Sequence, residues 1–212
     1  MKFKICLILV FLFSFCSNNA KAYAILNNLY LENMEEQLSD DFMFQENGVR
    51  SVYRSNAQKQ DKIDEVKEEL ELKFNKKVEV NDDEINIGTS LGDIDITFLS
   101  KDEDTIVCLT IINHNKDITI SKLMKELTEL QGKNIFDIRY FQYIKGKINN
   151  IDDRLVKIKN LHQISKIDTL DIHNGYVGTA NINNGGRVNI ALNNYNTGNY
   201  LIIGTPVIFT TY

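Results

Sequence analysis

Residues 78–112 read VEVNDDEINIGTSLGDIDITFLSKDEDTIVCLTII, and their spacing decides the fold class. Apolar and polar residues alternate in this stretch, and three short turns interrupt the alternation: Asn81–Asp83, Leu91–Gly92 and Lys101–Asp104. A period of two is typical of a strand with one buried face. Turns this short can join only antiparallel neighbours, because parallel neighbours need a long crossover connection. The stretch therefore predicts a run of antiparallel hairpins.

Helical spacing occurs on both sides of these hairpins. Apolar residues recur at steps of three and four in Gln60–Phe74, in a segment that begins at Ser121, and in one that begins near Asp152. Gly132 follows the second of these, where a left-handed residue commonly ends a helix. A further helix is expected over Ala24–Ser39.

The remaining segments with strand character are Val49–Tyr53, Phe136–Ile148, Gly175–Ile182, Arg187–Asn194 and Tyr200–Thr210. Pro206 lacks a backbone N–H, so the last of these strands is expected to be an edge strand or to be bulged there. Helices interspersed with antiparallel strands predict an α+β fold, in which helices pack on one face of antiparallel sheet in two layers. The segment 147–153 is the best candidate for a seam, which would divide the chain into subdomains 23–148 and 149–212.

The first 22 residues have the pattern of a secretory signal. Lys2 and Lys4 precede an apolar run of about a dozen residues, and Ala20-Lys21-Ala22 supplies the small residues at which a signal peptidase cleaves. We therefore expect residues 1–22 to be a signal peptide that is removed near Ala22. The rest of the chain is expected to be secreted and to work outside the cytoplasm.

Other interpretations of this segment are weaker. The apolar run is too short to span a bilayer about 30 Å thick, which argues against a membrane anchor. Cys16 ends the run as a lipidated cysteine would, but Phe15 precedes it where a lipoprotein signal has a small residue. Ala22-Tyr23-Ala24 repeats the small-residue pattern, so cleavage after Ala24 is a second possibility. No later segment has the length of a transmembrane helix, so none is expected in the mature chain.

Charge and cysteine content narrow the function classes. The whole chain carries a net charge of −5, and loss of three signal lysines leaves 21 basic and 29 acidic residues, or −8. Nucleic-acid binding relies on clustered positive charge, so the acidic balance and the export signal disfavour it. Nucleic-acid binding is supported only by the basic residues around the aromatic strand, which are Lys122, Lys125, Lys133, Arg139, Lys145 and Lys147. Cys108 is the only cysteine after the signal, so no internal disulfide is expected.

The sequence offers no catalytic constellation and predicts no metal or cofactor. Cys108 lies among apolar residues and is interpreted as a small buried residue. His114 and His173 lie in polar turns and His162 on a predicted helix, and none has a metal-ligand spacing to another. Asp93 and Asp95 share a strand face and could form an acid–base pair, which keeps an envelope hydrolase as the alternative function.

The end of the chain resembles the YwmB-like family. The resemblance is carried by residues 188–193, VNIALN, and 201–212, LIIGTPVIFTTY, with similar stretches at 49–54 and 143–146. It implies an exported protein of low-GC Gram-positive bacteria with an α+β fold, and it implies no catalytic residues. The family label "TATA-box-binding-like" is an analogy of fold, which does not carry function. This chain departs from the family at Asn193, where arginine is common, and at Thr210-Thr211, where an acid usually precedes the final tyrosine.

The leading hypothesis is a non-enzymatic binding or interaction module of the cell envelope. Its candidate interaction surface is the aromatic strand, with Tyr140, Phe141 and Tyr143. An envelope or protein partner is expected.

Overall fold

The computed structural model describes residues 30–183 and 186–210. The predicted signal peptide, with its cleavage residues Ala20 and Ala22 and with Cys16, lies outside the described residues. So does the first part of the helix predicted over Ala24–Ser39, whose described part is helical over residues 30–37.

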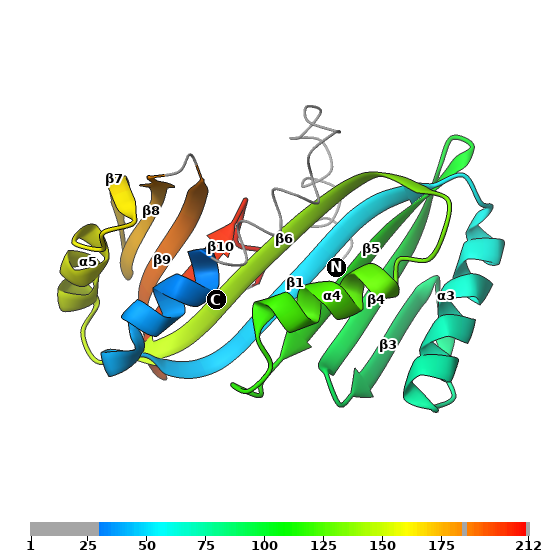
Figure 1. The fold of residues 1–212 in the computed structure, drawn as a ribbon, viewed down its shortest axis with the longest axis horizontal. Coiled ribbons are helices and arrows are strands. Elements are labelled where there is room, and N and C mark those ends of the chain that lie inside the picture. The colour runs from blue at the N-terminus through cyan, green and yellow to red at the C-terminus, as the bar shows by residue number, and fades with distance from the viewer. Residues whose placement is uncertain (1–29, 184–185, 211–212) are drawn as a thin grey trace.

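The protein is built on one ten-stranded antiparallel sheet, ordered β2-β3-β4-β5-β1-β6-β10-β9-β8-β7 (Figure 1). Its strands are β1 (Met43–Ser55), β2 (Val80–Asn81), β3 (Glu84–Thr89), β4 (Gly92–Lys101), β5 (Asp104–Asn113), β6 (Ile135–Ile148), β7 (Ile164–Ile172), β8 (Gly175–Ile182), β9 (Arg187–Tyr195) and β10 (Gly198–Thr205). The long strands β1 and β6 lie side by side in the middle of the sheet.

Four helices of the described chain pack against this sheet: residues 30–37, α3 (Lys59–Phe74), α4 (Ile120–Glu129) and α5 (Ile151–Lys159). A short 3₁₀ turn, η1 (Ser39–Asp41), leads into β1. One continuous cluster of buried apolar side chains lies between the helices and the sheet. The predicted α+β class is confirmed.

The predicted hairpins are confirmed in detail. In β4, Ile94, Ile96 and Phe98 are buried against the helices. Ile96 lies opposite Ile85 and Ile94 opposite Ile87 in the antiparallel register, so each turn brings apolar residues together on one face. Gly132 has a φ of +72° after α4, the left-handed conformation expected there.

The same order of elements occurs twice along the chain. β1 is followed by α3 and four strands, and β6 is followed by α5 and four strands. The sheet order is accordingly symmetric about the β1–β6 pair. The predicted division between residues 148 and 149 falls after β6, the first strand of the second unit, and the sheet is hydrogen-bonded continuously there because β6 also pairs with β10.

Several boundaries differ from those predicted. β1 is longer than Val49–Tyr53, because a bulge between Phe44 and Glu46 breaks the alternation that would have marked its first half. β10 ends at Thr205 and is internal, so Pro206 follows a strand instead of interrupting an edge strand. α5 ends at Lys159, which places His162 in the turn that leads into β7 and not on a helix.

A buried arginine connects α5 to the N-terminal part of the described chain. The guanidinium of Arg154 is fully buried, donates from Nη1 to the carbonyl oxygen of Leu38 at 2.9 Å, and lies 3.1 Å from Asp41. Within the described ranges, no helix has both the length and the apolar character that crossing a membrane requires.

Candidate functional site

The sheet face that points away from the helices is called the open face here, and its centre lies on β1 and β6. Strand alternation places Glu46, Gly48 and Arg50 of β1 on this face. Their register partners on β6 are Lys145, Tyr143 and Phe141. Paired residues of antiparallel strands lie on the same side of a sheet, so these six residues form two adjacent rows, with five side chains and a gap at Gly48.

The C-terminal segment, residues 206–210, lies across these rows. The ring of Phe209 packs edge-on against Tyr143, with centroids 4.9 Å apart, and against Phe141 at 6.5 Å. The Arg50 guanidinium lies 4.4 Å from the centroid of the same ring. Ile208 and Phe209 also cover the apolar side chains of Ala191 and Ile202 on the open face. The segment therefore closes a second, smaller apolar cluster on the side without helices.

Gly48 makes room for the central aromatic residue. A Cβ at position 48 would overlap the ring of Tyr143 on the neighbouring strand. The absence of a side chain therefore lets Tyr143 lie flat over β1, where Phe209 then contacts it.

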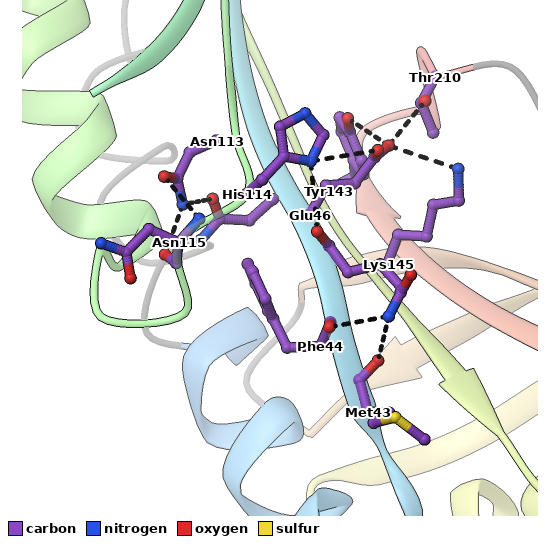
Figure 2. Close-up of polar contacts among 11 residues, drawn as sticks. Met43, Phe44, Glu46, Asn113, His114, Asn115, Tyr143, Lys145 and Thr210 are labelled. Carbon is purple, nitrogen blue, oxygen red and sulfur yellow. Dashed lines mark hydrogen bonds and ion pairs between the residues drawn. The ribbon is translucent and has the colours of Figure 1, made fainter. Parts of the chain in front are cut away.

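Glu46 is the polar hub of the site (Figure 2). Its Oε1 accepts hydrogen bonds from the Tyr143 hydroxyl at 2.9 Å and from Thr210 Oγ1 at 3.3 Å, and Lys145 Nζ lies 3.5 Å away. Nδ1 of His114, in the loop after β5, lies 4.0 Å from the second carboxylate oxygen. The Glu46 side chain is only 16% exposed, so these donors replace the water that it loses.

The electrostatics of this cluster favour fixed hydrogen bonds over proton transfer. Burial, reinforced by the negative charge of Glu46, raises the pKa of Tyr143 well above its usual value. The phenol therefore stays protonated and serves as a donor to the carboxylate. His114 is exposed and also approaches the carbonyl oxygen of Gln45 at 3.3 Å. The arrangement holds the C-terminal segment in place, and the described residues contain no His, Cys, Asp or Glu group suited to a metal ion.

The predicted aromatic surface does not form a single patch. Tyr140 is buried on the helix side, where its hydroxyl bonds to Gln131 Oε1 at 3.1 Å. Tyr143 is buried on the opposite side beneath Phe209. Only Phe141 is partly exposed on the open face. The odd spacing between residues 140 and 143 already indicates opposite faces of a strand.

Glu46, Arg50 and Phe209 were not predicted from the sequence as site residues. Glu46 lies in the first half of β1, next to the bulge after Phe44, and this half was not predicted as a strand. Arg50 lies within the predicted strand Val49–Tyr53 but was not singled out as a site residue. The alternation of Glu46, Gly48 and Arg50 is the signal that could have found them. Nothing local in the sequence indicates that Phe209 would lie against them.

The other candidate residues are dispersed. Asp93 and Asp95 are both exposed on the open face of β4. Neighbouring atoms still remove part of the water around Asp95, and this partial desolvation, together with the charge of Asp93, raises the pKa of Asp95. Cys108 was predicted to be a buried residue, but it is only half-buried. It lies on the face without helices, opposite Val52 and Thr97. The three histidines, His114, His162 and His173, are all exposed in turns or loops.

The predicted basic residues do not gather on one face. Lys122 and Lys125 lie on α4, whereas strand alternation places Arg139, Lys145 and Lys147 on the open face. There Lys145 pairs with Glu46 at 3.5 Å and Arg139 with Asp137 at 3.6 Å. Acidic neighbours therefore offset much of the positive charge.

A scan against protein-family models finds no match, and a search of curated proteins finds no significant similarity.

Proposed function

We propose that this protein is an exported, non-enzymatic binding module whose open face takes a polypeptide segment of a partner protein in the cell envelope. The observation that supports this is the seating of the chain's own residues 206–210 on that face. A short peptide with an aromatic side chain already fits between Arg50, Tyr143 and Phe141.

The seated segment can be displaced because side chains hold it. β10 ends at Thr205, and residues 207–209 have no regular secondary structure. A half-buried phenylalanine contributes about 1 kcal/mol, and a cation–π contact about 0.5–1 kcal/mol. Phe209 therefore contributes on the order of 2 kcal/mol, a contribution that an aromatic side chain of a partner can match in competition for the site.

Export and family resemblance support the location of this activity. The signal pattern of residues 1–22 favours secretion. The resemblance to the YwmB-like family, carried by VNIALN at 188–193 and LIIGTPVIFTTY at 201–212, includes the segment that occupies the open face.

The hydrolase alternative has less support. Asp93 and Asp95 are exposed on an open strand, whereas paired carboxylates in hydrolases work from within a cleft that controls the access of water. A pocket of about 530 Å³ beside α5 and the β7–β8 turn is lined by other residues.

Peptide binding to the full chain tests the proposal. A fluorescein-labelled peptide with the sequence of residues 207–212 is titrated into the Phe209→Ala variant, whose own segment no longer fills the site. We expect saturable binding by fluorescence anisotropy, and binding to the wild-type chain about tenfold weaker, because Phe209 competes there.

Two controls define the outcome. A peptide with alanine in place of phenylalanine should not bind, and Arg50→Ala added to Phe209→Ala should weaken binding by removing the cation–π contact. If the Phe209→Ala chain has a native circular dichroism spectrum and does not bind the peptide, the proposal that the open face recognises polypeptides is wrong.

A further inference from the structure

β7 gives the sheet an open edge. It is the outermost strand and pairs only with β8 among the described strands. Seven of its nine residues are exposed. An outermost strand presents unpaired backbone N–H and C=O groups along its free side, and these can pair with another strand.

The opposite edge of the sheet, formed by β2, is better protected against pairing than β7 is. β2 has only two residues. Asp82 and Asp83, which follow it, both have positive φ and turn the chain sharply into β3. Short edge strands of this kind are a common defence against unwanted pairing. β7 lacks that protection over most of its length.

Apolar side chains mark one side of β7. Leu170 is 66% exposed and Ile172 is 37% exposed, and both lie on the open-face side, opposite Val177 and Gly175 of β8. An incoming strand would place its own side chains beside them on the same face. Apolar residues at those two positions would therefore be covered on binding.

An acidic pocket lies on the other side of the same strand end. It has a volume of about 530 Å³, and its lining includes Asp152 of α5, Asp171 of β7 and Tyr176 of β8. The Tyr176 hydroxyl donates to Asp152 Oδ1 at 2.7 Å. Within the described chain, neither carboxylate has an ion pair with lysine or arginine, and no lysine or arginine lines the pocket. The pocket is complementary to a basic side chain.

We propose that β7 binds an extended segment of a partner protein by strand addition, with a lysine or arginine of that segment in the acidic pocket. The residue opposite Asp171 would point to the helix side, toward Asp152 and Asp171. Its two neighbours would point to the open-face side, beside Leu170 and Ile172. The recognised pattern is thus apolar–basic–apolar, read by backbone hydrogen bonds and one pocket. This surface is separate from the site of residues 206–210, so either proposal can fail alone.

A charge exchange tests this inference on the full chain. The probe is a fluorescein-labelled, end-capped peptide, Thr-Ser-Val-Lys-Val-Ser-Thr, and its partner probe has glutamate in place of lysine. The wild-type chain should bind the lysine peptide. Asp171→Lys should bind it about tenfold more weakly and should prefer the glutamate peptide, because an attractive cross-strand pair becomes repulsive.

Asp168→Lys is the matched control, since it makes the same charge change on the other face of β7, where Asp168 pairs with Lys166 at 2.9 Å. Its affinity for the lysine peptide should stay within about twofold of wild type. Amide hydrogen exchange in residues 164–172 should slow when the peptide binds.

Two results would overturn the inference. One is equal affinity of the wild-type chain for the lysine and glutamate peptides, or no binding of either. The other is a dimer in light scattering that Leu170→Lys converts to a monomer, since the edge would then be occupied by a second copy of this chain.

Discussion

At the scale of single residues, two buried tyrosines differ in whether their hydroxyl has a partner. The Tyr53 hydroxyl is fully buried without a hydrogen-bond partner among the described residues, whereas the Tyr143 hydroxyl donates to Glu46 at 2.9 Å. Burial raises the pKa of both phenols, so both are neutral at ordinary pH.

We therefore expect Tyr53→Phe and Tyr143→Phe to change the free energy of unfolding in opposite directions. Tyr53→Phe removes a hydroxyl that gains nothing from burial, so the free energy of unfolding should stay the same or rise by up to about 1 kcal/mol. Tyr143→Phe should lower it by about 1–2 kcal/mol, because Glu46 loses a donor. Urea unfolding of both variants checks this, and a larger loss for Tyr53→Phe would contradict it.

The ion pair between Lys62 and Glu65 predicts a pH dependence. Lys62 Nζ is buried, and bonds to Glu65 Oε2 and to the carbonyl oxygen of Gln131, each at 2.9 Å. Partial burial opposes ionisation of Glu65, but hydrogen bonds from Lys62 and from the backbone N–H of Lys133 outweigh it and hold the pKa of Glu65 below its usual 4.5.

A carboxyl group with a lowered pKa stabilises the fold when it is ionised. This contribution is present above pH 4.5 and is lost as the pH falls through the lower pKa of the folded state. Glu65→Gln should reduce the free energy of unfolding at pH 7 and should have a smaller loss between pH 4.5 and 3 than wild type. Urea unfolding across that range measures both, and parallel pH profiles would contradict the assignment.

At the scale of the strands, the approach of Tyr143 to Gly48 is a packing requirement. Gly48→Ala would place a Cβ within the Tyr143 ring. We expect this change to displace the ring, to weaken its contact with Phe209, and to lower the free energy of unfolding by about 1–3 kcal/mol.

Gly88→Ala is the matched control on β3. Its Cβ would lie 3.5 Å from Asp93 Oδ1, an ordinary contact, and alanine reduces the entropy of the unfolded chain. Its stability should equal or exceed that of wild type in the same urea titration. Equal losses for the two variants would mean that the Tyr143 contact is not the cause.

Strands with strong alternation were predictable, and weak ones were not. Ile94, Ile96 and Phe98 mark β4 because one face of that strand is fully buried. β7 was missed because most of its residues are exposed and its few apolar residues do not alternate regularly. It is a strand only because β8 pairs with it.

At the scale of the whole molecule, processing of the N-terminal segment is the first prediction to check. Expression of the full chain in a Gram-positive host should release a protein that begins at Tyr23, because Ala20 and Ala22 fit the small-residue requirement of signal peptidase. N-terminal sequencing of the secreted protein measures this. Ala22→Phe should accumulate the uncleaved precursor, and a lipid-modified N-terminal cysteine would instead assign the lipoprotein alternative.

The repeated order of elements is a property of the whole molecule, and no internal repeat in the sequence indicates it. Two units of one strand, one helix and four strands meet at β1 and β6. Corresponding strands of the two units occupy symmetric places in the sheet, but the units differ at their edges, where β2 has two residues and β7 has nine.

The sequence by itself determined the α+β class, the hairpins of residues 78–112 and the helices around them, because period and turn length are local properties of the chain. Tertiary structure alone decided that β1 pairs with β6, that residues 206–210 lie on the open face, and that β7 forms an open edge. These features join residues far apart in the chain, such as Arg50 and Phe209. Alternation within a strand specifies which residues share a face, but only packing of the whole chain specifies what covers it.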